Sequence, residues 1–161
     1  MVRIDCSYLI PAPREAVWEV LTHPEWEHEH TWLMSNPNRV LERRPDGVRF
    51  WTRRDRKRAV GRPDAVSLFD GTFDRANWRI TWRILQGFEA GSEYVEELTE
   101  EAGGTRVRAH GRISLKGIEW DWRIMGTLLP WKARALVERN ICRDYKHIKQ
   151  RLTGEASSSV R

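Results

Sequence analysis

The residues with the clearest potential for chemistry are a glutamate and a tyrosine in one alternating segment. Glu96 lies between Tyr94 and Leu98, so these three side chains share one face of a predicted strand. We interpret that face as inward, which would bury the carboxyl, raise its pKa and suit it to acid/base chemistry or to orienting a ligand. The alternatives are a salt bridge to a cavity arginine, or the opposite parity.

Arg134 is the arginine that could form such a salt bridge. It falls on the apolar stripe of a predicted C-terminal helix, and Asp144 borders the same stripe. Arg134 could pair with Glu96 or meet an anionic ligand group; a side chain that only extends to water at a helix end is the competing interpretation. The catalytic candidates are therefore Glu96, Arg134 and Tyr94.

Metal-ligand residue types gather in the run HPEWEHEH, residues 23–30. His28 and His30 are two positions apart, so they do not face the same way on a helix, and no distant Cys or His partner is evident. A polar helix edge at a cavity mouth fits the run better, and we predict no metal and no cofactor. The sequence has no Ser-His-Asp, P-loop, dinucleotide or zinc signature.

Nine tryptophans are the main compositional anomaly, and they indicate a large apolar interior. The predicted ligand-binding residues are Phe50, Trp78, Trp82, Tyr94, Glu96, Trp122, Met125, Arg134, Val137 and Ile141. The alternative is that the apolar members simply fill the core and leave no room for a ligand. The bulky stretch 118–125 is either a gate or an interaction patch.

A long helix over about 121–152 must position part of this set. From residue 131 to residue 152 the chain lacks Pro and Gly and is rich in helix formers. Spacings of three and four give an apolar stripe of Val137, Ile141, Tyr145, Ile148 and Leu152. Gly154 follows as a stop. Such a helix cannot bury its stripe alone, so the preceding residues must supply the opposing surface.

The preceding segments alternate as strands. They predict strands over 2–10, 39–44, 48–54, 65–70, 78–85, 93–99 and 105–116. Two short helices are expected after the first strand, from Pro13 to about 22 and over 25–33. Glu93 and Glu97 are expected to face arginines of the neighbouring strands across the outer surface, so those arginines are poor evidence for DNA binding.

Length and composition limit the remaining possibilities. The 161 residues predict one domain over 1–154 and a disordered tail over 155–161. The net charge is +5, but acidic residues are interleaved with the basic ones, so we predict no nucleic-acid partner. No segment approaches the ~18 apolar residues of a membrane span, so no integral membrane association is expected. Without a signal peptide, and with Cys6 and Cys142 in no motif, we predict a cytoplasmic protein.

The segment IPAPREAVWEVLTHPE, residues 10–25, resembles the opening motif of the START/Bet v 1-like (SRPBCC) superfamily, in its polyketide cyclase/dehydrase and lipid-transport branch. The turn GGTRV at 103–107 and the helix end YKHIKQRL at 145–152 are also similar to that family. The resemblance implies an α+β helix-grip fold. A curved seven-stranded antiparallel sheet would wrap around the long C-terminal helix and enclose a cavity roofed by the two short helices.

Members of this superfamily hold lipids, sterols, polyketides or other apolar molecules. The leading hypothesis is therefore binding of a small hydrophobic or aromatic ligand, lipid- or polyketide-like. One alternative is an aromatase/cyclase in which Glu96, Arg134 and Tyr94 orient the substrate and move protons. Another is a co-chaperone-like interaction module that resembles heat-shock ATPase activators. Ligand identity, oligomeric state and whether the protein is an enzyme stay open at this point.

Overall fold

A computed structural model describes residues 1–23, 39–54, 65–87, 89–114 and 128–154. Along the chain these residues form β1 (Val2–Ile10), α1 (Arg14–Thr22), β2 (Arg39–Arg44), β3 (Gly47–Arg54), β4 (Ala65–Asp74), β5 (Arg79–Gln86), β6 (Glu93–Glu101), β7 (Gly104–Ile113) and α3 (Pro130–Thr153). Each predicted strand has a counterpart. The second predicted short helix, 25–33, and the tail lie outside the described residues.

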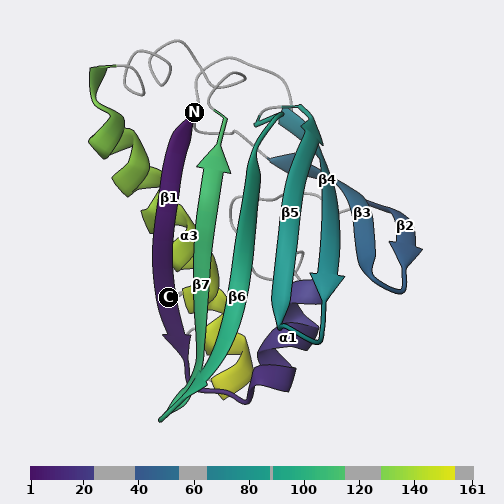
Figure 1. Cartoon of the computed structure of the whole chain (residues 1–161), viewed down its shortest axis with the longest axis vertical. Coiled ribbons are helices and arrows are strands. Elements are labelled where there is room, and N and C mark those ends of the chain that lie inside the picture. The colour runs from purple at the N-terminus through teal and green to yellow at the C-terminus, as the bar shows by residue number, and fades with distance from the viewer. Residues whose placement is uncertain (24–38, 55–64, 88, 115–127, 155–161) are drawn as a thin grey trace, which may run out of the picture.

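The strands form a single sheet in the order β1-β7-β6-β5-β4-β3-β2, and all neighbours are antiparallel. The first strand thus pairs with the last, and the other strands pair in sequence order. Figure 1 shows the sheet bending around α3, which passes behind β1 and β7, while α1 lies at the lower end. The predicted curved antiparallel sheet around a long C-terminal helix is confirmed.

Several predicted boundaries shift: β6 continues to Glu101 instead of residue 99, and β7 ends at Ile113 instead of residue 116. Three other shifts have local reasons. β4 continues past residue 70 to Asp74 because Phe73 still packs inward and pairs with Ile80. Trp78 precedes β5 instead of starting it, since its backbone has a φ of 53°. α3 begins at Pro130, whose fixed φ suits a first helical position. It ends as predicted, with Gly154 in the left-handed region at φ 67°.

The outer face of the sheet pairs acids with bases as expected. Glu93 lies opposite Arg83 and Arg112 in the register, and Glu97 lies opposite Arg79 and Arg108. The Arg83 guanidinium lies 3.5 Å from the Glu93 carboxylate. Exposed pairs of this kind contribute only about 0.2–1 kcal/mol each, so they favour this register without dominating the stability.

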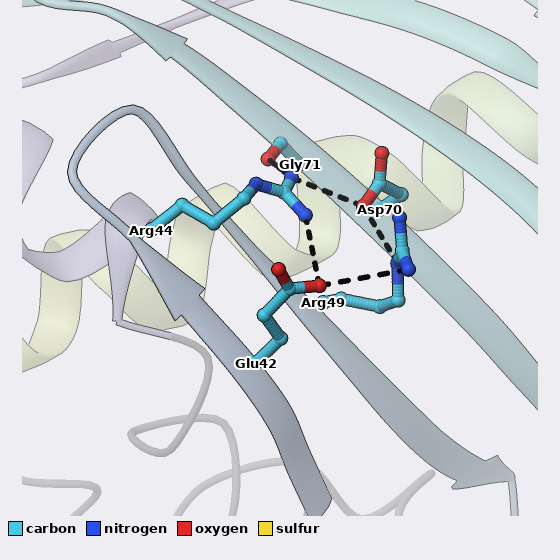
Figure 2. A network of polar contacts seen from close by, with 5 residues as sticks. All are labelled: Glu42, Arg44, Arg49, Asp70 and Gly71. Atoms are coloured by element: carbon cyan, nitrogen blue, oxygen red, sulfur yellow. Dashed lines mark hydrogen bonds and ion pairs between the residues drawn. The ribbon is translucent and has the colours of Figure 1, made fainter.

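A denser polar network holds the β2–β3 hairpin against β4 (Figure 2). Asp70 Oδ1 accepts hydrogen bonds from Arg49 Nε at 3.0 Å and from Arg44 Nη2 at 3.1 Å. Arg44 also donates to the Gly71 carbonyl at 3.2 Å, and both arginines lie within 3.5 Å of Glu42 Oε2. These arginines are committed to carboxylates of their own sheet, which gives the network a structural role.

Candidate functional site

Glu96 is the polar centre of the concave face. Its side chain points inward from β6, as the alternation predicts, and the residue is only 5% exposed. The Tyr145 hydroxyl donates to Glu96 Oε1 at 2.6 Å, and the Trp82 indole N–H donates to Oε2 at 3.0 Å. The alternative salt bridge to an arginine is not among its contacts with the described residues. The carboxyl is instead held by two neutral donors.

This environment favours the protonated, uncharged forms of Glu96 and Tyr145. Burial raises the pKa of Glu96, and the hydrogen bonds from Tyr145 and Trp82 oppose that rise. Burial and the nearby Glu96 carboxyl raise the pKa of Tyr145 well above its usual value. Indole N–H can only donate, which leaves Oε1 as the oxygen whose proton could be shared with the Tyr145 hydroxyl. The Tyr145 oxygen would then accept the bond that it otherwise donates.

Three elements bring these groups together. Trp82 on β5 is the register partner of Tyr94 on β6. Its ring lies across Gly71 of β4, where a Cβ atom would collide with the indole. Tyr145 reaches the carboxyl from α3 and is 2% exposed. The cluster therefore ties the helix to the middle of the sheet.

An aromatic surface continues from this cluster along the concave face. Neighbouring ring centroids are 5.3–6.3 Å apart, and most pairs meet edge to face. The rings in contact order are Phe69, Phe50, Trp82, Phe73, Trp18 and Trp78. The structure thus brings the predicted residues Phe50, Trp82 and Glu96 into one region.

The other predicted lining residues have different surroundings. Tyr94 and Ile141 are partly buried and pack against the core, and Val137 is half-buried on α3. Trp78 is also half-buried, but the guanidinium groups of Arg14 and Arg75 lie 4.0 and 3.7 Å from its ring centroid. Two further predicted lining residues, Trp122 and Met125, lie outside the described residues.

Arg134 is not brought to Glu96. Its Nε donates to Glu138 Oε1 at 2.8 Å, one turn along α3, and its side chain is 49% exposed. Eleven residues separate it from Tyr145, which corresponds to about 16 Å along a helix. The apolar stripe placed Arg134 on the correct helix, but near the edge of the sheet instead of its centre.

Tyr145 is the residue that the sequence reasoning missed as part of a site, although it was assigned to the apolar stripe. A buried tyrosine needs a partner for its hydroxyl, and Glu96 was the one acidic side chain assigned to the inward face. These two requirements together are the signal in the sequence that pairs Tyr145 with Glu96.

The described residues contain no group of three or more His, Cys, Asp or Glu placed to hold a metal ion. His23 is exposed at the end of α1, with Nδ1 2.7 Å from the Glu19 carbonyl oxygen; His28 and His30 lie outside the described residues. Over the same part of the chain, the helices are too short or too polar to cross a membrane.

Comparisons with known proteins show which solved structures have a similar fold. No protein-family model matches the sequence, and no curated protein matches it significantly. Similar solved structures include TTHA0849 from Thermus thermophilus, with 21% identity over 96% of this chain and 99% of that chain, at a TM-score of 0.76. The Zhui aromatase/cyclase from Streptomyces sp. R1128 shares 20% identity over 99% and 95% of the two chains, at a TM-score of 0.66.

An AHSA1-like protein from Aeromonas hydrophila is also similar, with 16% identity over 99% of this chain and 98% of that chain, at a TM-score of 0.57. Identities this low show a shared fold and no more. The chain therefore has the helix-grip fold of the START/Bet v 1-like superfamily, and the resemblance stated from the sequence is confirmed at this level.

Proposed function

We propose that the protein binds a small hydrophobic or aromatic ligand, lipid- or polyketide-like, between the concave face and α3. The observation that carries this proposal is the Glu96 cluster, a carboxyl shielded from water beside a continuous aromatic surface. Burying a carboxyl is costly unless its hydrogen bonds are satisfied, and a site that orients a ligand is one reason for a chain to carry that cost.

The contact that we propose for each side chain with the ligand follows from how deeply that side chain is buried. Phe50 and Trp82 would supply apolar contact, worth roughly 25 cal/mol for each Å² removed from water. Val137 and Ile141 would cover the ligand from α3, since both are half-buried on the helix. Tyr94 would supply the polar contact, because it is less buried than Glu96.

A second candidate is an aromatase/cyclase reaction on a polyketide-like substrate. It is favoured by the burial of Glu96, which raises the pKa of its carboxyl and so favours the protonated form that a general acid needs, and by the fold shared with the Zhui aromatase/cyclase. Glu96 would give its carboxyl proton to a substrate carbonyl oxygen, and the resulting carboxylate would take up the proton lost from the adjacent substrate carbon, so that an enol forms and the carboxyl is restored. Glu96→Gln should then abolish turnover without loss of stability, and unchanged turnover would remove Glu96 from the mechanism.

We also propose a cytoplasmic protein without a nucleic-acid partner. Four of the outer-face arginines pair with carboxylates of the sheet, namely Arg44, Arg49, Arg106 and Arg108. Those side chains are unavailable to a phosphate backbone unless their ion pairs break, which disfavours an extended basic track.

A thermal-shift series with fatty acids and planar polycyclic phenols tests the binding proposal. Ile141→Trp should reduce the stabilisation by a bound ligand, because the larger side chain would occupy space facing the sheet. Arg139→Trp, at an exposed position of the same helix, should leave it unchanged. Equal ligand responses in the two variants would argue against a site between α3 and the sheet.

A further inference from the structure

A recess lies away from the Glu96 cluster, where α3 meets the edge strand β1. It encloses about 360 Å³ and is lined by Arg3, Ile4, Asp5, His110, Gly111, Arg112 and Arg134. In Figure 1 the first turns of α3 project beyond β1 before the helix passes behind the sheet. This crossing explains how Arg134 of the helix joins residues of β1 and β7.

Two arginines of the recess face each other across the ladder. Arg3 of β1 and Arg112 of β7 are direct register partners, and both are exposed. Opposite side chains in an antiparallel pair have Cβ atoms about 4.5–5.5 Å apart, and like charges there are destabilising. The fold therefore holds two cations together at a position where an uncharged pair would avoid that repulsion.

The carboxylates around the recess already pair with arginines, one of which, Arg134, belongs to the lining. Asp5, the one acid in the lining, receives two hydrogen bonds from Arg108, both at 2.9 Å. Glu138 Oε1 accepts hydrogen bonds from Arg134 and from the Asp5 backbone N–H, each at 2.8 Å. Glu93 of β6 is the register partner of Arg112 on its other side, and its carboxylate lies 3.5 Å from the Arg83 guanidinium. Among the described residues, no ion pair joins a carboxylate to Arg3 or Arg112.

We propose that this recess binds a phosphate group. Its lining has a formal charge of +2 with His110 neutral, which a phosphate dianion would neutralise. Guanidinium groups suit this ligand because each can donate two parallel hydrogen bonds to phosphate oxygens. Arg3 and Arg112 are the primary ligands, and Arg134 closes the recess from the helix. The phosphate could come from a free phosphorylated metabolite or from a lipid headgroup.

Thermal unfolding with added inorganic phosphate at constant ionic strength tests the site directly. The wild type should show a saturable rise in Tm. Arg3→Gln/Arg112→Gln should weaken the apparent phosphate affinity by about tenfold for each arginine lost. Without phosphate, this variant should unfold close to the wild-type temperature, because the lost repulsion between the arginines offsets the lost attraction between Glu93 and Arg112. That measurement also shows that the variant folds.

Arg79→Gln/Arg83→Gln provides the matched control, since it removes two arginines from β5 on the same outer face. It should keep the wild-type phosphate response.

Co-sedimentation with phosphatidylcholine vesicles, with and without phosphatidylserine, separates the two sources of the phosphate group. A response to free phosphate supports a soluble ligand, and vesicle binding without that response supports a headgroup. The proposal is overturned if neither occurs, or if Arg3→Gln/Arg112→Gln responds like the wild type.

Discussion

Removing the Tyr145 hydroxyl tests whether Glu96 is held as the structure indicates. Tyr145→Phe leaves the ring in its 2% exposed position and removes the donor that lies 2.6 Å from Glu96 Oε1. The carboxyl oxygen then has no partner in an environment that water does not reach. A lost hydrogen bond between neutral groups costs about 0.5–1.5 kcal/mol, and one to a charged group about 1.5–3 kcal/mol.

Because a hydrogen bond to a charged group costs more to lose than one between neutral groups, the destabilisation by Tyr145→Phe should depend on pH. The folded-state pKa of Glu96 lies above its ordinary value of 4.5, so the stability contributed by its protonated form is complete below that value. It is lost as the pH rises through the folded-state pKa. Tyr145→Phe removes a bond that opposes this rise and so raises the pKa further. The loss in unfolding free energy should be about 1 kcal/mol in acid and grow to about 2–3 kcal/mol once Glu96 ionises.

Urea unfolding at several pH values measures the loss of unfolding free energy both in acid and after Glu96 has ionised. A loss of 2 kcal/mol corresponds to a Tm decrease of about 4–8 °C for a chain of this size. Tyr8→Phe is the matched control, because Tyr8 of β1 packs against the core but is not one of the two hydrogen-bond donors to Glu96. If Tyr145→Phe costs no more than Tyr8→Phe at every pH, the hydrogen bond to Glu96 does not hold α3 to the sheet.

One further substitution and one labelling reaction test how tightly side chains pack between the sheet and the helices. Gly71→Ala should lower the unfolding free energy by about 1–3 kcal/mol, because the new methyl group meets the Trp82 ring; wild-type stability in urea would mean that the ring does not cross Gly71. Burial beside Cys142 raises the pKa of Cys6 to about 12. Since the thiolate is the reactive form, iodoacetamide at pH 8 should label Cys6 far more slowly than a thiol with an ordinary pKa. Peptide mass spectrometry measures this, and rapid labelling of the folded protein at Cys6 would contradict the burial.

Much of the fold could be predicted from local patterns. The alternation in 2–10 and 93–99 fixed both the strands and their inward faces, because a one-residue slip would expose every apolar side chain. The ends of strands are harder to predict from the sequence where a glycine leaves space for a neighbouring side chain instead of forming a turn. Gly71 looked like the end of a strand, but it is a position inside β4 where the Trp82 ring needs the space of a missing side chain.

The site was only partly predictable for a related reason. The inward parity of Glu96 followed from its neighbours in the strand, whereas its partner depended on how far along α3 the helix meets the sheet. A periodic stripe specifies which face of a helix is buried and leaves that position undetermined. The stripe therefore offered Arg134 as a partner for Glu96 and left Tyr145 as a packing residue, and only the position at which α3 crosses the sheet shows that Tyr145 is the one that reaches the carboxyl.

Native mass spectrometry of the purified protein is the most direct test of the proposed ligand binding. We expect a second species, heavier by the mass of one small apolar molecule, that collapses to the bare chain under stronger activation. Ile141→Trp should deplete this species, and Arg139→Trp should retain it. A spectrum of the bare chain alone, together with no thermal shift from any fatty acid or polycyclic phenol, would contradict the claim that the concave face holds a ligand.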